Sequence, residues 1–261
     1  MESLIERLRD AQGLAKLIGE APAFLKGSEQ LPAVAKSDAT VLITGETGTG
    51  KELVARAIHY LSKRAAFPFT PMNCGLLPDT LPEDELFGHE RDTFTDTHPL
   101  GRNLIARADK GTLFIDDLEA LTLKAQKDLL RLLQNKKFCA SGSSHEQLAD
   151  VRIVAATDAP LDQRVRAGSF RSDLYDRLCD FSIHLPPLRE RQGDIVALSR
   201  HFLKKHAPRQ AGPELQLAPE AREALLAYDW PGNVKELERA IIRGIHLSQT
   251  NLIQAKDLGI P

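Results

Sequence analysis

The chain has 261 residues, with 34 Lys and Arg, 36 Asp and Glu and a formal net charge of −2. This length suffices for one large domain, or for one domain and a smaller one, around a buried core. The balanced charge argues against a protein that coats nucleic acid, because such proteins are strongly basic. No apolar run approaches the ~18 residues of a membrane span and no signal-peptide pattern opens the chain, which predicts a cytoplasmic protein without membrane contact. The cysteines Cys74, Cys139 and Cys179 lie in no metal or redox spacing and suit a reducing compartment.

Short apolar runs alternate with longer amphipathic stretches, which is the pattern of an α/β domain with a mainly parallel sheet. Runs rich in β-branched and aromatic residues predict four strands, over residues 40–44, 112–115, 151–156 and 181–185. Apolar side chains that recur on one face predict helices over residues 53–61 and 123–134.

The strand signals stop after Pro186 and Pro187, and from Asp194 onward the chain is predicted to be entirely helical. The expected helices of this part span residues 195–205, 219–228 and 234–247. A charged run at residues 189–191 marks the boundary. We therefore expect an α/β domain over residues 1–190 and a small all-helical lid over residues 191–261, with a short amphipathic helix over residues 1–16.

A glycine-rich segment between a predicted strand and a predicted helix carries the first functional motif. It consists of Gly45, Glu46, Thr47, Gly48, Thr49, Gly50 and Lys51. This is the phosphate-loop pattern, in which glycines let backbone N–H groups surround phosphate oxygens and the lysine reaches the terminal phosphates. The helix that follows adds the positive end of its dipole. Glu52 stands where the general pattern has a Ser or Thr that contacts magnesium.

Two carboxylates, Asp116 and Asp117, follow the strand expected over residues 112–115, at the edge where parallel sheets bind ligands. Asp116 is the expected partner of a magnesium ion, through water, and Asp117 is expected to orient or deprotonate the attacking water. The alternative for Asp117 is the N-cap of the next helix.

With their surroundings, these residues resemble the AAA+ ATPase domain of the sigma-54-dependent bacterial enhancer-binding regulators, the NtrC-type activators. The matching segments are residues 17–19, 45–55, 73–74, 85–90, 108–114, 170–178, 185–191 and 230–234. Glu52 after the lysine is itself a mark of that family. The resemblance implies a P-loop AAA+ fold with a lid, ATP and Mg²⁺ as cofactors, and a ring, usually a hexamer, with ATP bound between neighbouring subunits.

The resemblance also implies roles for two arginines. Arg171 and Arg177 match the family's trans-acting arginines, which reach the γ-phosphate of the neighbouring subunit. Such a guanidinium can stabilise transition-state charge and so accelerate hydrolysis ~10³–10⁵-fold. Six residues apart on a helix, the two would not share a face, so we expect them to have different roles. The alternative is that they pair with Asp173 or Asp176 on a solvated surface.

Three further positions take their expected roles from the same resemblance. Asn73 matches a residue that holds the water-activating carboxylate until the subunit is engaged, and its alternative role is to cap a strand end or turn. The adenine-contacting segment of the family matches Leu17, Ile18 and Gly19. Lys235 occupies the position of the nucleotide-sensing arginine. Beside it, Asn233 and Glu236 predict a capping box for the lid helix.

The chain departs from the family pattern in the loop that contacts sigma-54. Activators carry Gly-Ala-Phe-Thr-Gly-Ala there, whereas this chain has Asp92, Thr93, Phe94, Thr95, Asp96 and Thr97. The two aspartates replace glycines whose backbone freedom they lack, and they add negative charge to a binding surface. In the alternative interpretation Phe94 packs in the core and the loop is a solvated acidic turn. Contact with sigma-54 is therefore in doubt.

Three more departures fall in the nucleotide site. Asp117 is one methylene shorter than the family's glutamate, which predicts slower hydrolysis because a general base must lie within hydrogen-bond reach of its water. Asp158 replaces the sensor asparagine, and an ionised carboxylate can only accept hydrogen bonds. Lys235 replaces arginine and cannot make its planar two-pronged contact.

The sequence thus predicts the ATP-binding AAA+ domain of a sigma-54-type, two-component transcriptional regulator that oligomerises and hydrolyses ATP slowly. The alternative is a nucleotide-gated binding and oligomerisation module that regulates transcription without ATP-driven remodelling of sigma-54. A nucleotide kinase or a DNA-loading ATPase fits the phosphate loop but not the other motifs. The expected partners are further copies of the chain, and no direct DNA contact by this segment is expected.

Overall fold

The computed structural model describes residues 19, 21–22, 24–25, 29–76, 81–88, 103–140, 145–207 and 215–260. The chain divides into two compact units. The core unit comprises the described residues of Gln30–Thr44 and Lys51–His184, and the lid unit comprises those of Lys16–Glu29, Gly45–Gly50 and Leu185–Pro261. The phosphate loop is thus grouped with the lid rather than with the sheet.

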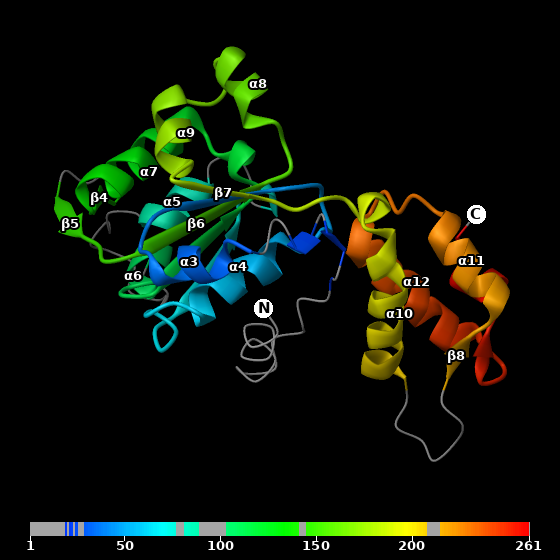
Figure 1. Cartoon of the computed structure of the whole chain (residues 1–261). Helices are drawn as coiled ribbons and strands as arrows, with labels where there is room; N and C mark the ends of the chain where they lie inside the picture. The colour runs from blue at the N-terminus through cyan, green and yellow to red at the C-terminus, as the bar shows by residue number, and fades with distance from the viewer. Residues whose placement is uncertain are drawn as a thin grey trace, which may run out of the picture. The chain divides into compact units, whose positions relative to one another are not determined.

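A five-stranded parallel sheet forms the centre of the core unit, in the order β2-β3-β6-β1-β7 (Figure 1). The strands are β1 (Val41–Thr44), β2 (Phe69–Asn73), β3 (Thr112–Asp116), β6 (Arg152–Thr157) and β7 (Phe181–His184). In the register, Val41 pairs with Val154 on one side and with Phe181 on the other. All six residues of β6 are buried, as expected for a strand covered on both faces.

Helices flank this sheet, so the predicted α/β fold with a parallel sheet is confirmed. In Figure 1, α3 and α4 lie on the opposite side of the strands from α7 and α9. The α-helices of the core unit are α3 (Leu31–Lys36), α4 (Lys51–Tyr60), α5 (Leu81–Phe87), α6 (Leu104–Arg107), α7 (Leu123–Asn135), α8 (Leu161–Arg166) and α9 (Ser172–Leu178). Short 3-10 helices η1 (Cys74–Leu76) and η2 (Leu118–Ala120) follow β2 and β3, and β4 (Lys137–Cys139) pairs antiparallel with β5 (Glu146–Leu148).

A buried arginine joins β6 to the end of α3. Arg152 is 1% exposed and donates hydrogen bonds to Val34 O (2.7 Å) and Ala35 O (3.2 Å). These carbonyls belong to the last turn of α3, where helix carbonyls have no partner within the helix. Burial lowers the pKa of Arg152 to about 10, which still leaves the guanidinium charged at neutral pH.

The lid unit is mainly helical, with η3 (Leu188–Glu190), α10 (Gln192–His206), α11 (Pro219–Ala227), α12 (Asn233–Leu247) and α13 (Ala255–Leu258). Its core contains Trp230, which is fully buried, lies edge-on to Tyr228 and donates from Nε1 to Leu225 O at 2.8 Å. The expectation that every element after Asp194 is a helix is wrong in detail. The two-residue strands β8 (Gln216–Leu217) and β9 (Leu252–Ile253) pair in parallel. The sequence did not predict them, because each is too short to show a periodic pattern.

The four predicted strands and all five predicted helices with described residues are present, with ends shifted by a few residues. Strand β2 was not predicted, because Pro71 interrupts its pattern. The helix predicted over residues 1–16 lies outside the described residues. Among the described residues, none of the helices has both the length and the apolar character needed to cross a bilayer.

Candidate functional site

The core unit gathers polar side chains at the carboxyl ends of three adjacent strands. Asn73 ends β2 and pairs in register with Asp116, which ends β3. Asp117 follows β3, and Asp158 follows the next strand, β6. Because parallel strands point their carboxyl ends to one edge, the fold brings these four predicted site residues to the edge where such sheets bind ligands.

Lys51 is the buried charged group of the site in the core unit, and Asp116 beside it is half-buried. Lys51, the first residue of α4, is 7% exposed. Burial raises the pKa of Asp116, and the neighbouring Asp117 raises it further, whereas Lys51 opposes both effects. The Asp117 N–H donates to Asp116 Oδ1 at 3.1 Å. A half-buried carboxylate beside a second negative charge is a position that a cation would stabilise.

Asp117 adopts a left-handed backbone conformation, with φ of 53°. It precedes η2 at the N-cap position, but its side chain makes no capping hydrogen bond. The next long helix, α7, is capped by Thr122 instead, whose hydroxyl accepts from Ala125 N at 3.1 Å. A Cβ at Gly75 would lie 2.8 Å from Asp117 Oδ2, so the carboxylate packs against a residue without a side chain. Asp117 thus occupies the N-cap position of the alternative interpretation, but its side chain does not cap the helix.

Asn73 caps the turn that follows β2. Its Oδ1 accepts a hydrogen bond from Leu76 N at 3.0 Å, at the end of η1. This is the alternative role that the sequence left open for Asn73. The bond occupies Oδ1, and the Nδ2 group remains the donor with which Asn73 could contact a carboxylate.

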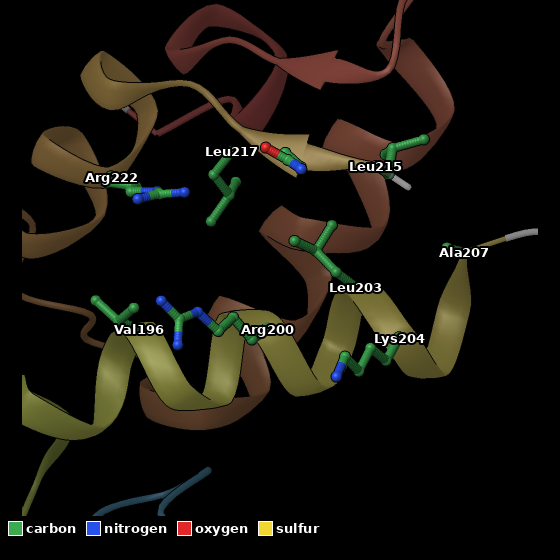
Figure 2. Close-up of a pocket in the computed structure, with 9 residues that line it drawn as sticks. Val196, Arg200, Leu203, Lys204, Ala207, Leu215, Leu217 and Arg222 are labelled. Carbon is green, nitrogen blue, oxygen red and sulfur yellow. The ribbon is translucent and has the colours of Figure 1, made fainter. Parts of the chain in front are cut away.

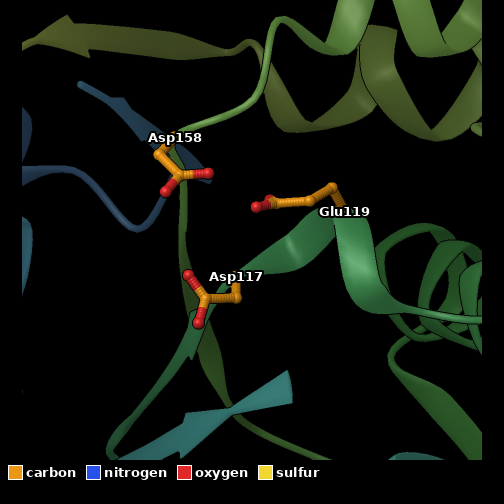
Figure 3. Close-up of side chains that lie close together, drawn as sticks. All are labelled: Asp117, Glu119 and Asp158. Atoms are coloured by element: carbon orange, nitrogen blue, oxygen red, sulfur yellow. The ribbon is translucent and has the colours of Figure 1, made fainter. Parts of the chain in front are cut away.

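A third acidic residue, Glu119 of η2, joins Asp117 and Asp158 (Figure 3). One carboxylate oxygen from each lies within 4.8 Å of the others. Thr157 donates its hydroxyl to Glu119 Oε2 at 2.5 Å. Burial raises the pKa of Glu119, and a hydrogen bond with Asp158 raises it further. Sequence reasoning missed Glu119, whose only signal was its place two residues after Asp117.

The two predicted trans-acting arginines lie at opposite ends of α9. Arg171 precedes the helix and makes two hydrogen bonds to Asp173, from Nε at 3.0 Å and from Nη2 at 2.6 Å. Its backbone N–H donates to Gln126 Oε1 at 2.9 Å, which fixes the start of α9 against α7. Arg177 lies exposed in the last turn. The surface pairing that was the alternative is present for Arg171 with Asp173.

In the lid unit, the phosphate loop bends through glycines with positive φ. Gly48 has φ of +81° and Gly50 has φ of +106°, a region that side chains rarely adopt. A Cβ at Gly48 would also lie 2.3 Å from the Gly232 carbonyl oxygen. Glycine is thus required at Gly48 both by the backbone and by the close approach of the lid.

Three consecutive carbonyl groups of the loop accept hydrogen bonds from the rest of the lid unit. Thr47 O accepts from Asn233 Nδ2 at 3.0 Å, Gly48 O accepts from Val234 N at 3.0 Å, and Thr49 O accepts from Arg191 Nη2 at 2.9 Å. A phosphate loop binds anions through its N–H groups, and a carbonyl turned toward a phosphate would repel it. Because these carbonyl groups already accept hydrogen bonds from the lid unit, the loop is compatible with an anion site formed by its N–H groups.

The Glu46 side chain is held by two residues of the lid. Arg189 makes two hydrogen bonds to its carboxylate, at 2.6 and 2.9 Å, and Asn233 Nδ2 makes a third at 3.1 Å. Arg189 and then Asn233 hold the pKa of Glu46 below its usual range. The predicted capping box of Asn233 and Glu236 is wrong. Gly232 is the N-cap of α12, and only Glu236 contributes, by accepting from Gly232 N at 2.7 Å, because Asn233 is engaged by the loop.

The structure also describes three of the remaining predicted site residues. Glu52 pairs with Arg56 one turn along α4, at 2.7 Å, on the helix surface. Lys235 is exposed, and a Cβ at Gly48 would lie 3.3 Å from its Cβ. Gly19 packs under the Phe24 ring. Leu17, Ile18 and the sigma-54-contact loop at residues 92–97 lie outside the described residues.

A separate hollow of about 360 Å³ lies in the lid unit (Figure 2). Leu203 of α10 and Leu217 of β8 give it apolar walls, and Arg200 and Arg222 lie at its side. None of the predicted site residues lines it.

Comparison with known protein families and structures agrees with this geometry. The model of the Sigma-54 interaction domain matches residues 17–184, and the model of the AAA+ ATPase lid domain matches residues 189–259. The crystal structure of NtrX from Brucella abortus in complex with ATP superposes with a TM-score of 0.86 and 30% identity, over 98% of this chain and 57% of that one.

Curated relatives are regulatory proteins. The regulatory protein AtoC of Escherichia coli (strain K12) is 42% identical over 93% of this chain and 52% of its own length. The transcriptional regulatory protein XylR of Pseudomonas putida is 41% identical over 95% of this chain and 44% of its own. The chain thus spans about half the length of these relatives.

Proposed function

This chain belongs to the Sigma-54 interaction domain family, and from that premise we propose that it binds ATP through its phosphate loop and hydrolyses it slowly. The backbone N–H groups of residues 45–50 bind the phosphates, and Lys51 reaches the terminal ones. The observation that supports this best is the engagement of the loop carbonyls of Thr47, Gly48 and Thr49 by the lid unit. NtrX from Brucella abortus, a solved relative, was crystallised with ATP and with ADP.

A magnesium ion is part of the proposal, with Asp116 as the residue that would hold it, through water. Its carboxylate fits because it is a hard, half-buried oxygen donor whose pKa is raised by burial and by Asp117. The ion would neutralise charge on the phosphates. Lys51, at the start of α4, supplies a second positive charge beside Asp116.

For hydrolysis, we assign the orientation of the attacking water to Asp117, with Asn73 as the residue that restrains its carboxylate. Arg171 and Arg177 act on the ATP of a neighbouring subunit in a ring. The exposure of Arg177 and the partial exposure of the Arg171 side chain support this assignment, because a guanidinium that acts in trans must reach the surface of its own subunit. The short side chain of Asp117 makes the expected turnover slow.

A second candidate function is a nucleotide-gated oligomerisation module without ATP-driven remodelling of sigma-54. Asp158 favours it, because the carboxylate at the sensor position lies beside Glu119 and Asp117. The carboxylate of Asp158 would repel the γ-phosphate rather than donate a hydrogen bond to it. The two functions differ in turnover and not in ATP binding.

For the whole protein, we propose a two-component regulator of the cytoplasm that assembles into a ring, with an α/β part over residues 1–190 and a lid over residues 191–261. Contact with sigma-54 is the part least supported by the residues, because aspartates replace both glycines of the contact loop. DNA contact is not assigned to this segment.

The test is the steady-state ATPase rate as a function of protein concentration, with ATP affinity measured on the same preparation. A rate per subunit that rises with concentration supports a site completed by a neighbour. Tight binding without turnover at any concentration supports the gated module. A protein that binds no ATP contradicts both.

A further inference from the structure

The Asn233 side chain joins two separate segments of the lid unit. Its Oδ1 accepts a hydrogen bond from Leu188 N at 2.7 Å, and its Nδ2 donates to Thr47 O at 3.0 Å and to Glu46 Oε2 at 3.1 Å. The partners fix the orientation of the amide, because a donor faces its oxygen and two acceptors face its nitrogen. One side chain therefore ties the phosphate loop to the segment that precedes α10.

The backbone holds this amide in place. Asn233 is fully buried and has φ of +53°, a conformation in which asparagine is favoured over most residues. Its N–H donates to Trp230 O at 2.8 Å, and the next N–H, of Val234, donates to Gly48 O. The turn that starts α12 is thus anchored on the buried Trp230 and reaches the loop twice.

The contact of Asn233 with Glu46 matters for anion binding, because Glu46 is negatively charged. Glu46 is the only acidic residue among residues 45–50. A carboxylate free to move next to bound phosphates would repel them. Asn233 and Arg189 together hold it with three hydrogen bonds.

We propose that Asn233 is a positioning residue that holds the phosphate loop in the conformation that accepts ATP phosphates. It acts through Thr47 and Glu46 rather than on the nucleotide itself. This assignment rests on the proposed ATP binding, and it makes the lid a part of the loop's anion site.

The first test replaces the amide by a carboxylate of the same shape. Asn233→Asp keeps the acceptor for Leu188 N but points an oxygen at two other oxygens, those of Thr47 and Glu46. We expect the Kd for a fluorescent, non-hydrolysable ATP analogue to rise at least ~10-fold. Arg239→Gln, an exposed change on the same helix, is the matched control and should leave the Kd unchanged.

The second test reverses the polarity of the pair. Glu46→Gln gives the loop an amide that can donate to the new carboxylate at position 233. The loss caused by Asn233→Asp should therefore be at least ~5-fold smaller in the Glu46→Gln background than in the parent. A role confined to the folding of the lid would give the same loss in both backgrounds.

A third variant covers the case in which a buried carboxylate prevents folding. Asn233→Gly accepts φ of +53° without strain and removes the side-chain bonds, so it should raise the Kd about 5-fold. If the folded variants bind like the parent, or if the losses in the two backgrounds are equal, the assignment of Asn233 is wrong. If the parent itself does not bind the analogue, the proposed function is wrong as well.

Discussion

Asp117 and Asp158 extend from adjacent parallel strands so that their carboxylate oxygens lie within 4.8 Å of each other and of Glu119 (Figure 3). Burial raises the pKa of Glu119, and the hydrogen bond and charge of Asp158 raise it further. The proposed water-orienting group therefore lies beside two further acidic side chains.

The raised pKa of Glu119 predicts that the free energy of unfolding depends on pH, and Asp158→Asn should reduce this dependence, because Asp158 contributes to the raised pKa. A carboxyl whose pKa is raised on folding stabilises the protein below its ordinary pKa, and this stabilisation is lost as the pH rises through the raised value. Glu119 should thus lower the free energy of unfolding as the pH rises above 4.5. We expect Asp158→Asn to stabilise the protein at pH 7 by on the order of 1 kcal/mol and to flatten the pH profile. Urea unfolding from pH 4 to 8 measures both effects, with the exposed change Asp176→Asn as control.

The proposed phosphate contact of Lys51 is tested by Lys51→Ala. Loss of a charge-assisted contact of about 3 kcal/mol should weaken ATP binding roughly 100-fold. The measurement is a titration with the fluorescent analogue, and Lys63→Ala removes an exposed lysine as control. ATP affinity that survives in Lys51→Ala would contradict the assignment.

The arginines that flank α9 should affect turnover and not binding. Arg171→Ala or Arg177→Ala is expected to leave the ATP Kd unchanged and to reduce kcat by about 10³-fold, if each acts on a neighbour's γ-phosphate. The measurement is the ATPase rate at the highest protein concentration, with Arg166→Ala as a control that also loses a surface ion pair. Unaltered turnover would leave Arg171 as a partner of Asp173 only.

The length of the Asp117 side chain is tested by Asp117→Glu. If the missing methylene limits hydrolysis, the longer side chain should raise kcat, by about tenfold or more, without a change in Kd. The steady-state rate decides it. No gain would assign the slow step to Asp158, and the double change with Asp158→Asn would then be the one that accelerates hydrolysis.

Arg152→Met should destabilise the core unit by about 2–4 kcal/mol, because it removes the buried hydrogen bonds to Val34 O and Ala35 O, and only Val34 O keeps a donor in the Ser37 N–H. Urea unfolding compares it with Arg107→Met, a change on an exposed helix residue. A loss below 1 kcal/mol would mean that water replaces the guanidinium.

The sequence predicted the elements whose pattern is local. The strands at Thr112 and Arg152 are continuous apolar runs, and the phosphate loop is a contiguous motif, so both could be recognised without tertiary information. Strand β2 escaped because Pro71 weakens its pattern, and the structure tolerates this proline because β2 is the edge strand.

The contacts that shape the site could not be predicted, because they join distant parts of the chain. Asn233 is a credible capping residue in its local sequence, yet its side chain bonds to Glu46 and Thr47, far earlier in the chain. Glu119 has no motif and gains its meaning only beside Asp158, on a neighbouring strand. Pairing of Arg171 with Asp173 could be anticipated because the two are close in sequence.

Trp230 and Cys74, both buried, give the protein two native reporters of unfolding, one in each unit. Trp230 is the only tryptophan of the chain and lies in the lid unit, whereas all three cysteines lie in the core unit. Burial, reinforced by Asp117, raises the pKa of Cys74 to about 12, so this thiol is inert toward alkylating reagents until the core unit opens. Intrinsic fluorescence therefore follows the lid, thiol trapping of Cys74 follows the sheet, and the order in which the two units unfold can be observed without attaching a label.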